Sequence, residues 1–408
     1  MGRRKLGIYV HIPFCVRKCA YCDFLSFPAS GRTQEAYFRA LREEIAAFEN
    51  ADEYEAVSVY FGGGTPSLPP AGEITDTLEV ICRSFSVAKD AEITIECNPG
   101  TLDREKLYAY RKAGCSRLSL GLQSADDTLL KTLGRIHTWE TFLREYHEAR
   151  GAGFDNISVD LMYGLPGQTL AVWKDTLEKV TALAPEHLSA YSLIIEEGTP
   201  FWERYHEDDE TKKRGDRTLF LPDEDEEDRM LEMLKFSLRD IGMHRYEISN
   251  YARPGRESRH NTGYWLRREY AGFGLGASGQ IGKIRYRNKS SLTEYLKGLS
   301  EPEKNYRKPD PEGLQEEGVP GAEHPLWEEV TVLTREDEIA ETMILGLRLT
   351  EGVDLQRFEE TFSVRAEDLF EEEIAMFRRE GLLELAGHHL RLTDSGFDVS
   401  NLVMSSFL

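Results

Sequence analysis

The sequence lacks any apolar run long enough to cross a membrane. A transmembrane helix needs about 18 consecutive apolar residues, and the 408 residues contain no such run. The first residues, MGRRKLGIYVHIPFC, are basic and then apolar, as in a secretory signal, but His11 and Pro13 interrupt them and no cleavage site follows. We therefore interpret this segment as a first strand. We expect a cytoplasmic protein that has at most peripheral membrane contact.

The chain also lacks an excess of basic side chains. Lys and Arg number 50 against 72 Asp and Glu, which gives a formal net charge of −22. The acidic residues are concentrated in 206–229 and around 301–340. A surface of this sign repels phosphate backbones, so nucleic acid is not an expected partner. We interpret the acidic segments as solvated surface, although 206–229 could also be a lid or a docking surface for a partner.

Cysteine is scarce, with six residues in all. A disulfide framework is not expected in a long cytoplasmic chain. Cys82, Cys97 and Cys115 are scattered on apolar segments, and we predict that they are buried small hydrophobic residues. The other three cysteines lie together in CVRKCAYC (15–22).

Strand and helix patterns alternate through the first half of the chain, which indicates a parallel sheet covered by helices. Helical patterns such as 33–49 and 138–153 lie between the strand-like runs. Polar residues cluster at the carboxyl ends of the runs, which favours a partial (β/α)6 TIM-like barrel of the α/β class. The six predicted strands are 7–13, 56–64, 92–99, 117–123, 156–166 and 187–195.

The alternation becomes irregular after residue 196. We predict a helix at about 224–241 and a short strand at 245–249. A loop rich in glycine and aromatic residues is predicted to follow, up to about residue 280.

Three parts of the chain are predicted from these patterns. Residues 1–295 form the barrel, and 296–334 form an irregular acidic connection. Residues 335–408 contain three helical patterns and a hairpin around Gly387, which predicts a small α+β domain of winged-helix type. Its helices are acidic, so we do not expect it to bind DNA.

The clustered cysteines, Cys15, Cys19 and Cys22, stand at spacings of four and three residues. Structural zinc needs four N or S ligands, usually from two paired knuckles, and the sequence shows no second knuckle. A [4Fe–4S] cluster takes one thiolate on each iron, so three cysteines leave one iron open. We therefore predict such a cluster, with a substrate or cofactor on the fourth iron.

CVRKCAYC has the CxxxCxxC spacing of the radical S-adenosylmethionine (SAM) superfamily and resembles it closely. With YVHIPFC (9–15) and FGGGTPS (61–67), the chain resembles the oxygen-independent coproporphyrinogen III oxidase group over nearly its whole length. In that superfamily the amino and carboxylate groups of SAM chelate the open iron. The resemblance therefore implies SAM as a second cofactor.

The same resemblance implies which residues line the SAM pocket. Carboxylates suit the sulfonium, ammonium or ribose groups, and an arginine suits the methionyl carboxylate. Glycines let the backbone approach a ligand, although a tight turn explains them equally well. Two tyrosines match positions that pack on the cofactor and the cluster, although the first could be a core residue. The implied residues are Tyr9, Tyr21, Gly63, Gly64, Thr65, Glu96, Gln123, Arg135 and Asp160.

Two functions within this group remain open. Decarboxylating oxidases carry an additional cysteine two residues after the cluster, where this chain has Phe24, and a longer N-terminal extension. They also lack HNTGYW (260–265), which matches the HNxxYW motif of heme chaperones that deliver heme to respiratory proteins. The resemblance thus favours a heme chaperone. The alternative is radical-based oxidative decarboxylation of coproporphyrinogen III in porphyrin biosynthesis, which Phe24 makes doubtful.

HNTGYW supplies candidate contacts for heme. A neutral imidazole is a natural axial ligand for heme iron, which makes His260 a candidate ligand. Tyr264 and Trp265 could stack on the macrocycle. Ordinary packing is the alternative for all three, and His11 could ligate iron instead. Candidates for the heme propionates are Arg253, Arg256 and Arg259. Cleavage of SAM, the heme acceptor, and the choice between a monomer and a cluster-dependent dimer stay open.

Overall fold

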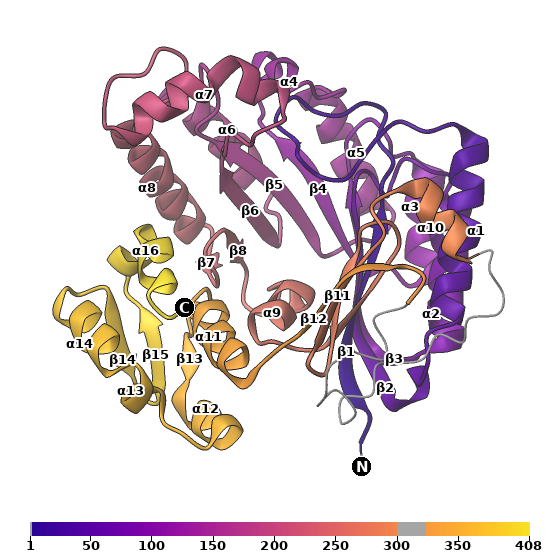
Figure 1. Ribbon diagram of the computed structural model, residues 1–408. Helices are drawn as coiled ribbons and strands as arrows, with labels where there is room; N and C mark the ends of the chain where they lie inside the picture. Colours follow the sequence, from indigo (N-terminus) through magenta and orange to yellow (C-terminus); the bar gives the residue numbers. More distant parts are fainter. Residues whose placement is uncertain (1, 300–323) are drawn as a thin grey trace.

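The computed structural model describes residues 2–299 and 324–408 (Figure 1). Six strands in the first half pair in parallel and in chain order, which confirms the predicted α/β architecture. They are β1 (Arg4–Ile12), β2 (Tyr54–Gly63), β3 (Ser86–Cys97), β4 (Arg117–Gln123), β5 (Ile157–Tyr163) and β6 (His187–Ser192).

Helices alternate with these strands and lie on the outer side of the curved sheet (Figure 1). Several begin at a Ser or Thr whose side-chain oxygen accepts a backbone N–H, as Ser30 does from Thr33. Such a cap stabilises a helix by about 1 kcal/mol. The helices are α1 (Gly31–Ala46), α2 (Ala71–Ser84), α3 (Arg104–Ala113), α4 (Asp127–Thr132), α5 (Trp139–Gly151) and α6 (Leu170–Ala182), with a 3-10 turn at Ala51–Glu53.

The core lies on both sides of this sheet. Leu6, Ile8, Val10 and Ile12 of β1 are completely buried, and the residues between them are buried or nearly so. A strand buried on both faces is expected where helices cover one side and the concave side is filled by other elements.

The sheet extends beyond the six parallel strands at both edges. Beside β1 lie β9 (Tyr270–Phe273), β10 (Ser278–Ile281), β11 (Ile284–Asn288) and β12 (Trp327–Val332). Beside β6 lie β8 (Asn250–Ala252) and β7 (His244–Arg245). The two edge strands, β12 and β7, do not pair with each other within the described residues, so the barrel is partial, as predicted.

Three predictions about the second half were wrong. The strand predicted at 245–249 is limited to the two residues of β7, His244–Arg245. The segment up to residue 280 is not a loop, because it contains β8 to β10 and the helix α9 (Arg259–Trp265), whose first turn is capped by Ser258. The connection is not irregular throughout, because its end forms β12, where Trp327 stacks on Tyr286 of β11 with ring centroids 4.3 Å apart. These elements are too short for a hydrophobic period to reveal them. Most of the predicted connection lies outside the described residues.

The acidic segment 206–229 spans the end of α7 (Pro200–Lys213) and the start of α8 (Glu224–Asp240), as the predicted helix at 224–241 anticipated. Asp208 accepts hydrogen bonds from the backbone of Leu219, Phe220 and Leu221. These bonds hold the loop between the helices against α7, so part of the acidic charge organises local structure.

A last helix of the barrel region, α10 (Leu292–Leu299), packs beside α1.

The C-terminal domain has its own hydrophobic core and a three-stranded sheet. Its strands are β13 (Val353–Asp354), β14 (Leu383–Ala386) and β15 (His389–Leu392), and the last two form the predicted hairpin around Gly387. Its helices are α11 (Arg335–Gly346), α12 (Leu355–Phe362), α13 (Ala366–Leu369), α14 (Glu371–Arg379), α15 (Asp394–Asp398) and α16 (Ser400–Ser405).

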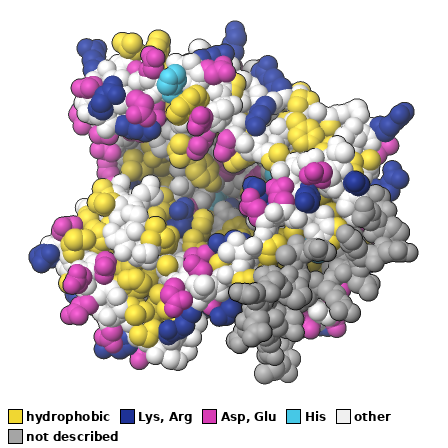
Figure 2. Space-filling view, viewed as in Figure 1, with side chains coloured by type: hydrophobic (Ala, Val, Ile, Leu, Met, Phe, Trp, Pro, Cys, Tyr) yellow, Lys and Arg dark blue, Asp and Glu magenta, His cyan; other side chains and the backbone are white. Residues whose placement is uncertain are grey.

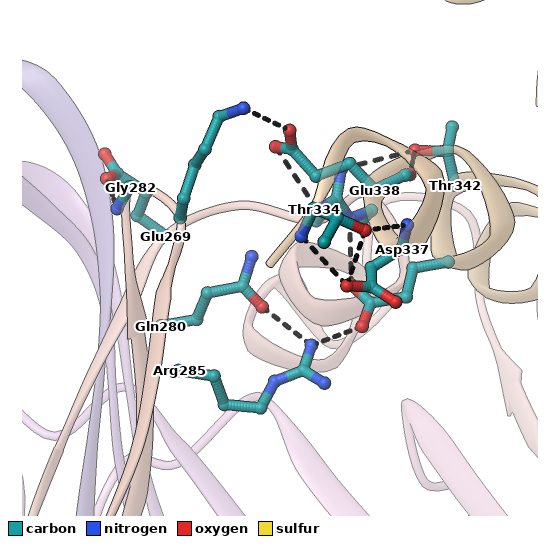
Figure 3. A network of polar contacts seen from close by, with 11 residues as sticks. Glu269, Gln280, Gly282, Arg285, Thr334, Asp337, Glu338 and Thr342 are labelled. Carbon is teal, nitrogen blue, oxygen red and sulfur yellow. Dashed lines mark hydrogen bonds and ion pairs between the residues drawn. The ribbon is translucent and has the colours of Figure 1, made fainter. Parts of the chain in front are cut away.

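Ion pairs join α11 of this domain to the edge of the large sheet. Glu338 pairs with Lys283 and with Arg267, and Glu341 pairs with Arg267 and with Arg285 of β11. Figure 3 shows Glu338 and Arg285 in this interface, beside Gln280 of β10. The network fixes α11 against the strands next to α9.

None of the helices in the described ranges is long and apolar enough to cross a membrane.

Candidate functional site

A central cavity of about 360 Å³ lies where the parallel strands end. Figure 2 shows the molecule hollowed between the elements at the top of the view and the C-terminal domain below. The cavity brings together most of the residues that the sequence singled out for the cluster and SAM. Those that line it are Cys15, Cys19, Tyr21, Cys22, Gly63, Gly64, Thr65, Glu96, Gln123, Arg135 and Asp160.

The three cysteines stand on the loop after β1, and all are partly exposed. Backbone hydrogen bonds tie this loop to three distant segments: Cys15 N–H donates to Phe27, Ala20 N–H to Leu133, and Phe201 N–H of α7 to Ala20. The thiol positions are therefore set by the barrel and by α7 rather than by the loop alone.

Two side chains donate to the sulfurs. Thr65 Oγ lies 3.5 Å from Cys15 Sγ, and Arg135 Nη1 lies 3.7 Å from Cys19 Sγ. A hydroxyl and a guanidinium therefore lie within donor distance of two of the three sulfurs.

The number of thiols bears on the kind of metal site. Cys15, Cys19 and Cys22 all line the central cavity. Structural zinc is held by four N or S ligands, whereas an iron–sulfur cube binds each thiolate on a different iron. Three thiols with one iron left for a ligand therefore fit the cluster.

The other cysteines follow the prediction only in part. Cys97 and Cys115 are buried, but Cys82 is exposed on α2. It was predicted as buried because its segment is apolar, whereas on the helix the neighbouring Ile81 takes the inward position.

Glu96 and Asp160 place two half-buried carboxyl groups on the cavity wall. Glu96 accepts hydrogen bonds from Tyr60 Oη at 2.7 Å and from the Gly63 backbone N–H at 3.1 Å. Burial raises the pKa of Glu96 to about 7 and raises the pKa of Asp160. A bound cation would offset the cost of ionising both groups, which fits the sulfonium and ammonium of SAM.

Arg135 has an unsatisfied N–H group inside the protein. Its Nη2 donates to Asn98 Oδ1 and to the Gly121 carbonyl, both at 2.6 Å. Its buried Nε has no hydrogen-bond acceptor among the described residues. Because a buried unmade hydrogen bond costs about 1–3 kcal/mol, a carboxylate from a ligand in the cavity would stabilise the site.

Backbone strain marks the end of β4. Gln123 has φ +70°, and the pairing of β4 with β5 shifts register between Gly121 and Gln123. A non-glycine residue in this conformation costs free energy, and such residues concentrate at functional sites.

The structure gives a packing reason why two positions of FGGGTPS must be glycine, which the sequence did not reveal. Gly63 has φ +111°, and a Cβ there would lie 2.5 Å from the His11 ring. A Cβ on Gly64 would lie 2.9 Å from the Phe14 carbonyl oxygen. Close packing of β2 against the segment after β1 therefore requires both glycines, whether or not a ligand also approaches them.

Sequence reasoning missed several polar residues of the cavity. Ser119 and Ser158 donate to Asp160, and Asn98 holds Arg135. The two serines lie on the sides of β4 and β5 that face the cavity. Residues two apart in a strand face the same side, and Ser158 stands two residues before Asp160. This alternation is the sequence signal that could have identified them.

The helix α9, which contains HNTGYW, separates the central cavity from a second one. Ser258 and Asn261 line the central cavity. Tyr264 and Trp265 line the other, of about 530 Å³, which we call the outer cavity. Tyr9, predicted to pack on the cofactor, lines the outer cavity and is not among the residues lining the central one.

His260 lies between the two cavities and is only 3% exposed. Its Nδ1 is hydrogen-bonded to Ser58 Oγ at 2.9 Å, and its Nε2 to Tyr264 Oη at 2.8 Å. Burial lowers its pKa to about 3, so the ring is neutral, as an iron ligand must be. Both nitrogens are nevertheless occupied, so ligation of heme iron remains a prediction that requires Tyr264 to move.

The other heme candidates are placed as follows. His11 is hydrogen-bonded through Nδ1 to Tyr9 and through Nε2 to the Leu25 carbonyl, so it is occupied as well. The predicted propionate partners line neither cavity: Arg253 donates to the Pro185 carbonyl, Arg256 pairs with Asp155, and Arg259 pairs with Asp90.

Known proteins resemble this chain over its whole length. Residues 9–180 match the radical SAM superfamily, and residues 333–399 match the HemN C-terminal domain. The chain is 36% identical to the heme chaperone HemW of Lactococcus lactis, covering 100% of this chain and 98% of that protein. It is 34% identical to HemW of Bacillus subtilis, covering 98% of both.

A solved structure shares the fold. The coproporphyrinogen III oxidase HemN of Escherichia coli, a radical SAM enzyme, superposes with a TM-score of 0.80 at 23% identity, covering 99% of this chain and 90% of that one. This similarity includes the C-terminal domain as well as the partial barrel.

Proposed function

This chain belongs to the HemW family of radical SAM proteins, and we propose that it binds heme as cargo and passes it to acceptor proteins. The observation that carries the proposal is the position of α9. Its Tyr264 and Trp265 line the outer cavity, apart from the cavity that contains the cysteines. Heme in the outer cavity would therefore leave the cluster site intact. We expect the acceptors to be respiratory heme proteins and the exchange to occur in the cytoplasm.

The central cavity would hold the [4Fe–4S] cluster and SAM. When bound, the cluster supplies one-electron chemistry and an open iron. Cys15, Cys19 and Cys22 would ligate it, while Thr65 donates to the sulfur of Cys15 and Arg135 to the sulfur of Cys19. Glu96 and Asp160 would balance the positive charge of SAM, and Arg135 Nε would bind its carboxylate.

Phe24 supports a carrier rather than a decarboxylase. Its side chain is 61% exposed and lines the central cavity beside the cysteines. The phenyl ring cannot donate, accept or relay a proton, whereas the cysteine expected there in the oxidases can. The central cavity would then bind SAM without the thiol that the oxidases carry at this position.

An anaerobic assay of the protein with reconstituted cluster tests the proposal. One sample receives heme and is followed by its Soret absorption. A parallel sample receives coproporphyrinogen III and SAM and is followed for carbon dioxide and protoporphyrinogen. We expect stoichiometric heme binding without decarboxylation. Multiple-turnover decarboxylation would instead identify a coproporphyrinogen III oxidase.

A further inference from the structure

The outer cavity contains a group of cations that no assignment so far explains. Three arginines line it together with four aromatic side chains. Its volume of about 530 Å³ lies within the range of small-molecule sites. The arginines are Arg267, Arg268 and Arg285, and the aromatic residues are Tyr9, Tyr264, Trp265 and Tyr270.

Two of these arginines are already neutralised. Arg267 pairs with Glu338 and Glu341 of α11, and Arg285 pairs with Glu341. Figure 3 shows Arg285 between Gln280 and the helix that carries Glu338. These two guanidinium groups hold the C-terminal domain against the sheet, so they are not available for a ligand.

Arg268 differs from both. No carboxylate of the described residues lies within 4 Å of its guanidinium, whose one hydrogen bond is to the Arg259 carbonyl at 3.4 Å. Burial, and then the charges of Arg259 and Arg357, lower its pKa. Its Nη1 lies 3.0 Å from where a Cβ on Gly263 would be, so it packs directly on α9.

A second donor belongs to another residue that lines the outer cavity. The indole Nε1 of Trp265 is buried and has no acceptor in the described part of the chain. The ring of Trp265 is held in place by Arg348, which lies 4.2 Å from the ring centroid. An aromatic surface and two residues with unsatisfied donors line the outer cavity, which suits a flat ligand that carries carboxylates.

We propose that Arg268 pairs with a propionate of heme and thereby anchors heme in the outer cavity, with Trp265 Nε1 as a second donor. The inference rests on the proposed function, because it takes heme as the ligand. It replaces Arg253, Arg256 and Arg259, the arginines indicated by the sequence, which are bound elsewhere. Residues Tyr9, Tyr264 and Tyr270 provide the apolar wall for the macrocycle.

Titrations with two probes test the assignment in the full-length protein. Ferric protoporphyrin IX carries two free propionates, and its dimethyl ester carries none. We expect Arg268→Gln to weaken heme binding about ten- to a hundredfold, as for loss of a hydrogen bond between charged groups, and to leave ester binding unchanged. Arg268→Lys should restore part of the affinity, because it keeps the charge.

Arg83→Gln is the matched control, because it removes one positive charge from an exposed pair with Glu79 on α2. It should bind heme like the unmodified protein. Equal heme affinity of Arg268→Gln and the unmodified protein would overturn the assignment and leave the proposed function standing. An equal loss for heme and ester would overturn it too, since the effect would not involve propionates. If the unmodified protein binds neither probe, the proposed function and this inference both fall.

Discussion

Tyr60 and His260 lie face to face at the boundary between the two cavities, with ring centroids 5.0 Å apart and an interplanar angle of 20°. The Tyr60 hydroxyl donates to Glu96 on the central cavity, and His260 is hydrogen-bonded to Tyr264 on the outer cavity. A chain of contacts from Glu96 through Tyr60 and His260 to Tyr264 therefore joins the walls of the two cavities.

Tyr60→Phe should shift the pH dependence of SAM binding. The Tyr60 hydroxyl lowers the pKa of Glu96, which burial has raised to about 7, so its removal raises that pKa further. SAM is a cation there and prefers ionised Glu96, so its affinity rises as pH rises through this pKa. The midpoint of affinity against pH, measured by calorimetry, should move to higher pH.

Tyr9→Phe is the control for this shift. The Tyr9 ring also stacks on Tyr60, but its hydroxyl bonds to His11 and not to Glu96. It should leave the midpoint in place. A Tyr60→Phe profile that coincides with that of the unmodified protein would show that Glu96 does not control SAM binding.

Tyr264→Phe should expose the ligating nitrogen of His260. The hydroxyl that occupies His260 Nε2 is lost, while the aromatic ring that faces the outer cavity remains. If His260 ligates heme iron, affinity should stay equal or increase, and His260→Ala should abolish the absorption features of a histidine-ligated heme. Retention of the ferric heme spectrum by His260→Ala would exclude this residue as the ligand.

Cys19→Ser should abolish the cluster without unfolding the protein. The loop thiols lie outside the main hydrophobic core, which is built from the sheet and its helices. Iron content and charge-transfer absorption should fall to background, while the thermal unfolding temperature of the apoprotein should change little. Cys82→Ser, on the exposed face of α2, is the matched control and should keep its iron. Full iron content in Cys19→Ser would mean that other ligands hold the metal.

Glu44→Gln should flatten the pH dependence of stability. Glu44 is buried among the side chains of Tyr295 and Asn288 and the Gly274 N–H, and burial raises its pKa from 4.5 to about 7. Between these values the folded state holds a proton that the unfolded state has lost, so the free energy of unfolding falls as pH rises. The fall from this group is at most about 3 kcal/mol.

Denaturant unfolding at pH 5 and pH 8 measures this difference. The unmodified protein should lose more stability between the two pH values than Glu44→Gln does. Identical losses would show that Glu44 is ionised throughout this range.

Much of the site could be predicted because its signals are local. The cysteines occupy eight consecutive residues, and the strands β1 to β6 each carry enough apolar residues for their period to be recognised. Parallel strands bring their carboxyl ends to one edge, so Glu96, Gln123 and Asp160 were expected together, and all three line the central cavity. Short elements such as α9 and β12 left no comparable pattern.

The sequence by itself determined the order of the elements, the clustered thiols and the strand-end polar residues, because each depends on neighbours along the chain. Only the tertiary structure decided that Asn261 faces one cavity and Tyr264 another, that His260 Nδ1 is hydrogen-bonded to Ser58, and that no carboxylate of the described residues pairs with Arg268. These features arise where α9 packs between β2 and α11, segments far apart in the chain. The orientation of a short helix is set by such packing and not by its own residues.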